Sequence, residues 1–153
     1  MHTPFMVSAD LPLPERDLLN ISECFRLAAL LYTERLAHPD LPSAVDNFQG
    51  IVAQALFHIA EISEDSCMVK FMLWPLFIIG TECIDEGHRE AVKRRIISIY
   101  TESGFYNNLS GLRVLMRIWR DNADGTEAPP MINGQAFRWR YAMDKLDGEY
   151  III

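Results

Sequence analysis

We expect the fold to form around one apolar stretch, Phe71-Met72-Leu73-Trp74-Pro75-Leu76-Phe77-Ile78-Ile79-Gly80. None of these ten residues is charged, and burial of each large side chain contributes roughly 1.5–3 kcal/mol. The stretch is too short to cross a bilayer, which needs about 20 apolar residues. Pro75 would remove a hydrogen-bond donor from the middle of a strand. At the start of a helix it removes no hydrogen bond, because the first backbone N–H groups have no partner within the helix. We therefore predict a short buried helix entered near Trp74-Pro75, with Gly80 allowing a neighbouring helix to approach closely.

Length and composition predict a single globular domain. The chain has 153 residues, enough to bury about two-thirds of the surface of its unfolded state. Its hydrophobic fraction of 50% and charged fraction of 23% exclude a disordered or fibrous chain. The formal net charge of −7 opposes attraction to nucleic acid and to anionic membranes. We expect neither specific DNA binding nor membrane association.

The cysteines and the N-terminus predict an intracellular protein, nuclear or cytoplasmic. Cys24, Cys67 and Cys83 are odd in number and lack the spacing of metal ligands. A secreted disulfide framework is therefore not expected. Residues 1–5 contain neither the basic segment nor the apolar run of a secretory signal.

The first third of the chain predicts two amphipathic helices after an extended lead-in over residues 1–13. The first helix runs from residue 14 to residue 38. It ends there because Pro39 disfavours helical backbone geometry at the residue before it. Its predicted inward stripe consists of Leu18, Ile21, Phe25, Ala28 and Tyr32, widened by Cys24, Leu27 and Leu31. The second helix continues to Ile62 from Ser43-Ala44-Val45-Asp46, which has the form of a capping box.

Three further helical patterns follow the central stretch. One helix turns Val92, Ile96 and Ile99 inward and ends at Gly104, which suits a left-handed cap. The next begins at Asn107 or Asn108, and its predicted inward residues are Leu109, Leu112, Met116 and Trp119. The last spans residues 135–147, and its apolar face consists of Trp139, Ala142, Met143 and Leu146. Together the patterns predict an all-α, single packed-helix domain of about six helices over residues 14–153.

The sequence carries no motif that specifies a reaction. It lacks a glycine-rich phosphate loop, a Gly-x-Ser-x-Gly elbow and the histidine spacing of zinc sites. His58 and Glu61 reverse the Glu-x-x-His order of di-iron bundles, so we interpret His58 as a boundary or core histidine. Cys67 or Cys83 could form a nucleophilic site with a distant histidine, but a structural role is the better interpretation. We expect no catalytic residue, no metal and no cofactor.

One basic run, Lys93-Arg94-Arg95, permits two interpretations. It could contact phosphates or act as a weak nuclear-targeting signal. We favour a solvated helix face, because the side chains of a short basic run on a helix usually point into solvent.

Three segments carry a family resemblance: Ala28-Ala29-Leu30-Leu31-Tyr32-Thr33-Glu34-Arg35-Leu36, Leu73 to Cys83 followed by Arg89, and Gly104-Phe105-Tyr106-Asn107 leading to Leu115-Met116-Arg117-Ile118-Trp119. With this spacing the chain resembles the C-terminal part of the regulatory domain of fungal zinc-cluster transcription factors. The resemblance implies an all-helical module that takes part in effector response, self-association and regulation of activation. The six-cysteine cluster that binds zinc and reads DNA in that family is not found in this sequence, so the resemblance does not extend to DNA binding. It implies no catalytic residues either.

Two functions remain open at this point. The first is a non-enzymatic regulatory or interaction module that binds a protein partner, a second copy of itself or a small-molecule effector. The alternative is a small-molecule-binding protein or enzyme of fungal secondary metabolism on a reused helical fold. An apolar pocket would serve such a ligand, and its candidate lining residues are Tyr32, His58, Trp74 and Trp119.

Overall fold

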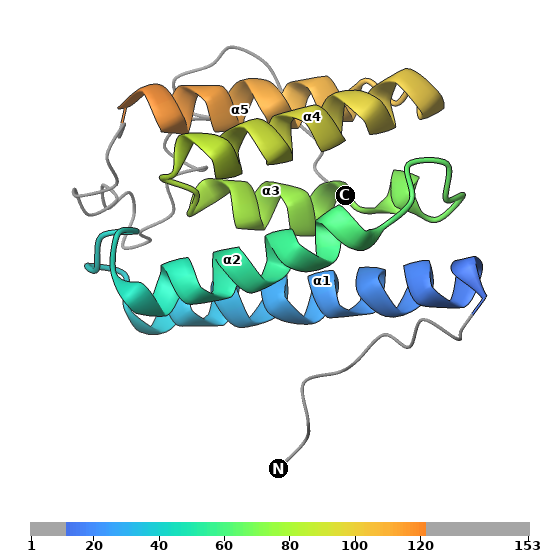
Figure 1. Ribbon diagram of the computed structural model, residues 1–153. Helices are drawn as coiled ribbons and strands as arrows, with labels where there is room; N and C mark the ends of the chain where they lie inside the picture. The colour runs from blue at the N-terminus through green and yellow to red at the C-terminus, as the bar shows by residue number, and fades with distance from the viewer. Residues whose placement is uncertain (1–11, 122–153) are drawn as a thin grey trace.

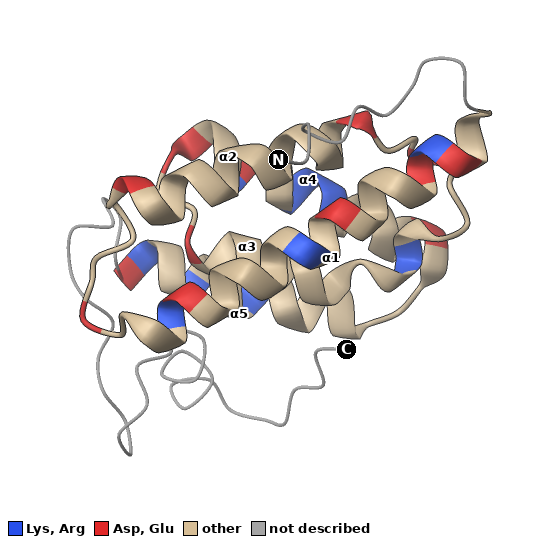
Figure 2. Ribbon diagram, turned by 90° about the horizontal axis from the view of Figure 1, so that it is seen from below, with Lys and Arg blue, Asp and Glu red and all other residues tan. Residues whose placement is uncertain are grey.

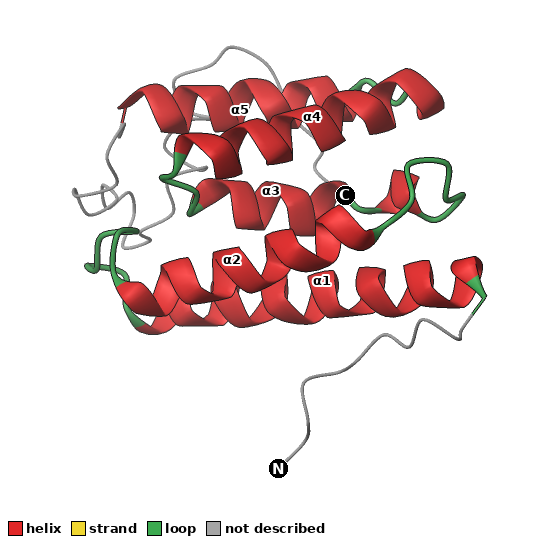
Figure 3. Cartoon of the chain, in the orientation of Figure 1, coloured by secondary structure: helices red, strands yellow, loops and turns green. Residues whose placement is uncertain are grey.

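The computed structural model describes residues 12–121, which form a bundle of helices joined by short loops (Figures 1 and 3). In chain order its elements are α1 (Leu13–Ala37), α2 (Asp46–Glu61), the short 3-10 helix η1 (Val69–Phe71), α3 (Leu73–Thr81), α4 (Glu86–Ser103) and α5 (Asn107–Asp121). The described part contains no strand, and the predicted all-α class is confirmed. The predicted helix over residues 135–147 and most of the predicted lead-in lie outside the described residues. In the described part, no helix has both the length and the apolar character needed to span a membrane.

Helix α3 occupies the middle of the bundle (Figure 1). It packs against α1 on one side and against α4 and α5 on the other. Eight of its nine residues are buried, and the remaining one, Trp74, is partly buried. A helix that is apolar on every face must be covered on every face, so α3 determines where its neighbours lie. The predicted buried helix is confirmed, although it begins at Leu73, which places Pro75 in the first turn, where backbone N–H groups have no intrahelical acceptor.

Gly80 is a point of close approach between α3 and its neighbours α4 and α5. A Cβ atom at this position would lie 2.8 Å from Leu115 Cδ1 and 3.3 Å from Val92 Cγ1. Its carbonyl oxygen accepts a hydrogen bond of 2.8 Å from the indole nitrogen of Trp119. The predicted role of Gly80 is therefore confirmed, with α5 as the helix that comes closest.

The ends of α4 and α2 show which of the predicted caps form. Asp85 caps α4 by accepting a 3.0 Å hydrogen bond from the backbone N–H of His88. Gly104 closes the same helix at φ 71°, in the left-handed region that favours glycine. The capping box predicted at Ser43 is wrong. Helix α2 is preceded by Val45 without a side-chain cap, because the Ser43 hydroxyl donates to Glu82 instead.

The inward face of α5 differs in part from the predicted stripe. Leu112 is buried as expected, but Met116 is 42% exposed, and that assignment is wrong. Gly111 and Leu115 face α3, where Leu115 packs on Gly80 and Gly111 lies against Leu73. Met116 follows Leu115 by about 100° around the helix and therefore turns outward. Helix α5 carries two overlapping apolar stripes at helical spacing, one with Leu115 and one with Met116. The stripe with Leu115 is the buried one, because Leu115 contacts Gly80.

Two glycine-to-alanine substitutions test the close contact at Gly80. Gly80→Ala forces Leu115 to move, which costs about 1–3 kcal/mol and outweighs a gain of about 1 kcal/mol in helix propensity. Gly50→Ala is the matched control, because Gly50 is exposed in α2 and a Cβ there meets nothing within 4 Å. We expect urea denaturation to show lower stability for Gly80→Ala and higher stability for Gly50→Ala. Equal stabilisation by both would contradict the tight contact.

Candidate functional site

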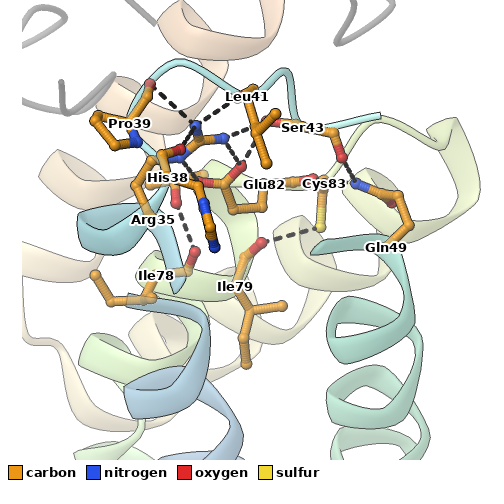
Figure 4. Close-up of polar contacts among 11 residues, drawn as sticks. Arg35, His38, Pro39, Leu41, Ser43, Gln49, Ile78, Ile79, Glu82 and Cys83 are labelled. Carbon is orange, nitrogen blue, oxygen red and sulfur yellow. Dashed lines mark hydrogen bonds and ion pairs between the residues drawn. The ribbon is translucent and has the colours of Figure 1, made fainter. Parts of the chain in front are cut away.

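A buried ion pair joins Arg35 of α1 to Glu82, the residue that follows α3 (Figure 4). Two hydrogen bonds connect them, from Nη2 to Oε1 at 2.7 Å and from Nε to Oε2 at 2.9 Å. Each residue is only 4% exposed. Bidentate arginine–carboxylate pairing is the strongest form of this interaction, and it fixes the angle between the two groups.

The groups around this pair satisfy its remaining hydrogen-bonding capacity (Figure 4). Arg35 Nη1 donates to the carbonyl oxygen of Leu41 at 2.5 Å, and its guanidinium lies 4.3 Å from the centre of the Phe48 ring. Ser43 donates to Glu82 Oε1 at 2.5 Å. Gln49 donates to the carbonyl oxygens of Ser43 and Glu82, at 2.7 and 2.8 Å. The network thus connects the end of α1, the following loop, the start of α2 and the end of α3.

This network has the properties of a structural centre. Its carboxylate and guanidinium neutralise each other, and neither is accessible enough to meet a substrate. Sequence reasoning missed it, although a signal was present. Arg35 lies one turn beyond Leu31 on the inward stripe of α1, and Glu82 directly follows an apolar helix. Two opposite charges at positions expected to be buried indicate a pair.

Polar contacts at the other end of α1 include His58. Its Nδ1 atom lies 2.8 Å from Oδ1 of Asn20, and burial lowers the pKa of the imidazole. Near it, Asp17 accepts hydrogen bonds from the backbone N–H and the hydroxyl of Ser63. The interpretation of His58 as a satisfied boundary histidine is confirmed. Among the described residues, no group of three or more His, Cys, Asp or Glu side chains could hold a metal ion.

The four residues predicted to line a ligand pocket enter three separate sets of contacts. Tyr32 and Trp74 come together, with ring centroids 6.4 Å apart, and Phe25 stacks on Trp74 at 6.3 Å. His58 pairs with Asn20, as described above. Trp119 contacts the Gly80 carbonyl group, and the Arg89 guanidinium lies 5.8 Å from the centre of its ring. Ligand binding at any of them stays a prediction.

Two arginines of α4 are used for packing. Arg89 is buried and donates to the Cys83 carbonyl oxygen at 3.0 Å. Arg95 is partly buried and donates to the carbonyl oxygens of Ile59 and Ile62 at the end of α2. The solvated face predicted for the basic run is therefore wrong for Arg95, while Arg94 is exposed. Figure 2 shows how the charged residues are distributed over the bundle.

An exposed apolar strip runs along the outer side of α1. Leu18, Phe25 and Leu36 are 49%, 37% and 54% exposed, although Leu18 and Phe25 were predicted to face inward. The core takes the neighbouring stripe instead: Ile21, Cys24, Leu27, Ala28, Leu31 and Arg35. Ser22 and Ala29 extend the outer strip at steps of four and three residues from Leu18 to Ala29, Leu36 lies seven residues further on, and none of these residues is charged. We call these residues, Leu18, Ser22, Phe25, Ala29 and Leu36, the α1 strip.

The cysteines divide into two buried residues and one exposed residue. Burial raises the pKa of Cys24 and of Cys83 to about 12, so both remain protonated at neutral pH. Cys83 Sγ lies 3.4 Å from the carbonyl oxygen of Ile79, in the last turn of α3. Both fit the structural role expected of a buried thiol.

Alkylation of the native chain should distinguish these thiols. With iodoacetamide at pH 8 we expect fast modification of the exposed Cys67, because the reaction requires an accessible thiolate. Cys24 and Cys83 should react only after addition of denaturant. Mass spectrometry of proteolytic peptides measures all three sites. Fast labelling of Cys83 in the native chain would show that it is not structural.

A double-mutant cycle tests the Arg35–Glu82 pair. Arg35→Met or Glu82→Leu alone leaves one buried charge without its partner and should lower the unfolding free energy by about 3–5 kcal/mol. The double variant removes both charges, so it should cost much less than the sum of the single changes. Urea denaturation of the four proteins gives the coupling.

The exposed pair Arg117–Asp121 provides the control, since its Nε and Oδ2 atoms are 3.0 Å apart at the surface. Asp121→Asn should change stability by about 1 kcal/mol or less. Additive effects at Arg35 and Glu82 would show that the two residues do not stabilise each other.

Comparison with known proteins gave one result. The sequence model of a family described as the fungal specific transcription factor domain matches residues 4–153. Searches of curated proteins and of solved structures gave no match. The match covers nearly the whole chain and agrees with the resemblance inferred from the three sequence segments. The chain belongs to the fungal specific transcription factor domain family.

Proposed function

We propose that the chain is a non-enzymatic regulatory module that acts through contact with a protein partner. The observation that carries this proposal is the α1 strip, an exposed apolar surface on a chain whose family supports a regulatory role. Its position in a transcription factor family favours action in the nucleus. The partner would supply the DNA contact, because a net charge of −7 weakens attraction to the phosphate backbone.

The α1 strip has the spacing by which one helix packs on another. Apolar residues at alternating steps of three and four form a seam along one side of a helix. From Leu18 to Leu36 this seam extends for about 27 Å at 1.5 Å per residue. Single exposed apolar residues are normal on protein surfaces, but several on one side of a helix are typical of an interaction site.

The partner that fits this surface is an apolar helix, and a second copy of the chain supplies one. In a two-fold symmetric pair each α1 strip would pack against the same strip of the other copy. The α1 strip contains no charged residue. Two strips in contact would therefore not place like charges next to each other. Self-association is therefore the first form of the proposal to test.

Two leucine-to-lysine substitutions on α1 test the strip. Leu36 lies on it, while Leu30 is 40% exposed and lies about 120° away around the helix. Multi-angle light scattering should show that the molar mass of the wild-type chain rises with concentration. Leu36→Lys should weaken association at least about tenfold, which corresponds to 1.4 kcal/mol. Leu30→Lys should behave as wild type.

Circular dichroism should confirm that both variants remain folded. A wild-type chain that stays monomeric at every concentration would exclude the second copy as the partner. Equal weakening by both variants would show that the α1 strip is not the interface.

A further inference from the structure

The outer side of α2 is an exposed face without charge. No aspartate, glutamate, lysine or arginine lies between Asp46 and Glu61, the two ends of the helix (Figure 2). Five residues of this stretch are exposed and lie within about 120° of one another around the helix. We call these residues, Gly50, Ala53, Gln54, Phe57 and Ala60, the α2 face. Charged side chains usually cover the solvent side of a surface helix, so their absence here needs an explanation.

Phe57 is the one large apolar side chain of the α2 face. It is 63% exposed, so most of its apolar area stays in water. Its ring lies 5.4 Å from the ring of His58, at an interplanar angle of 81°. His58 in turn is held to α1 by Asn20, whose Oδ1 atom is 2.8 Å from Nδ1. The exposed ring therefore leans on a fixed neighbour, which reduces the entropy that it loses when a partner contacts it.

The first half of the α2 face is low. Gly50 has no side chain, and a Cβ atom built there would meet nothing within 4 Å. With small side chains at Gly50 and Ala53, the axis of a second helix can come within about 8 Å of α2. The helix has 16 residues, which is more than four turns at about 3.6 residues per turn. Its shape suits another helix laid along it, with Phe57 between the side chains of that helix.

A carboxylate lies at each end of the α2 face. Asp46 and Glu61 are both exposed, and they lie about 20° and 40° from Phe57 around the helix. Both therefore point to the side on which a partner would lie. Each of them can pair with a basic residue near one end of a partner helix.

The neighbouring helices leave this border acidic. Glu34 of α1 accepts a 2.8 Å hydrogen bond from Asn47, beside the first end of the face. Arg26 of α1 is paired with Glu23 at 2.7 Å. Arg95 of α4 donates to carbonyl oxygens at the end of α2. Both arginines thus already have partners, and they do not neutralise the carboxylates at the ends.

We propose that the α2 face binds a helix of another protein, one with an apolar side and a basic residue near each end of that side. Phe57 supplies the apolar anchor, and the two terminal carboxylates select the charge of the partner. A second copy of the chain does not suit this face. In a parallel pair of α2 helices Asp46 would meet Asp46, and in an antiparallel pair it would meet Glu61. Like charges would face each other in both arrangements.

The α2 face is separate from the α1 strip. Cys24 marks the side of α1 that meets α2, since its Sγ atom lies 3.9 Å from the Ala55 carbonyl oxygen. Every residue of the α1 strip lies at least about 100° from Cys24 around that helix. The proposal therefore goes beyond the proposed self-association and does not depend on it. A chain that stays monomeric would leave the α2 face unchanged.

Fluorescence anisotropy with a dye-labelled, designed peptide tests the proposal on the full chain. The peptide is a helix of about 18 residues, or five turns, with leucine and alanine on one side and a lysine near each end of that side. We expect a Kd of micromolar order, because a single helix buries less area than the roughly 800 Å² per partner of a stable protein pair. A second peptide with glutamate in place of both lysines should bind about tenfold more weakly at low ionic strength.

Variants of the chain show where the peptide binds. Phe57→Gln should weaken binding of the lysine peptide at least about tenfold, because it removes the aromatic anchor. Phe105→Gln is the matched control, since Phe105 is 48% exposed in the loop between α4 and α5, and it should bind as wild type. Asp46→Asn combined with Glu61→Gln should weaken binding about threefold at low ionic strength. This difference should shrink as salt is added.

Four outcomes would overturn the proposal: no binding of the lysine peptide, equal binding of both peptides, unchanged binding by Phe57→Gln, or weaker binding by Leu36→Lys. The last would place the peptide on the α1 strip. Loss of self-association in Phe57→Gln, measured by light scattering, would show that a second copy occupies the α2 face and would also overturn it. If circular dichroism shows that Phe57→Gln is unfolded, Ala53→Lys replaces it under the same criteria, because it places a positive charge in the middle of the face.

Discussion

The requirement to cover α3 on all sides is the constraint on which the rest of the structure depends. This helix has no polar side that could face water, so its burial is possible only if other helices surround it. The long helices α1, α4 and α5 each place an inward stripe against it. Gly80 then brings α5 so close that a methyl group would fit only if the Leu115 side chain moved. The shortest α-helix in residues 12–121 thus determines the arrangement of its neighbours.

Packing of apolar surfaces alone would leave the position of α3 along α1 poorly defined. The Arg35–Glu82 pair supplies the missing specificity, because a bidentate contact exists in only one register. Apolar side chains of similar size would often be as stabilising at a buried site, since both charges lose their hydration. The same pair also holds the loop before α2, through Leu41 and Ser43. One polar contact therefore fixes three segments that hydrophobic packing would leave free to slide.

The sequence was sufficient for the elements of the fold but not for every inward face. The central helix, its glycine contact and the left-handed cap at Gly104 follow from local chemistry, and all were predicted correctly. The errors at Leu18, Phe25 and Met116 share one cause. Helices α1 and α5 each carry more apolar residues than one core-facing stripe can use, and only the position of α3 decides which stripe is buried. The ion pair was missed because its members are 47 residues apart in sequence.

The candidate site follows from the same excess of apolar residues on α1. A polar residue at Leu18 or Leu36 would not disturb the core, since both side chains lie largely outside it. Packing of the described helices therefore does not account for the apolar side chains at Leu18 and Leu36, whereas binding would. The strip is also held in place. Asp17 fixes the start of α1 to Ser63. Arg35, the residue before Leu36, fixes the end of α1 to Glu82. A surface that is already rigid loses less conformational entropy when a partner binds, so the buried network that orders the fold also prepares the strip for contact.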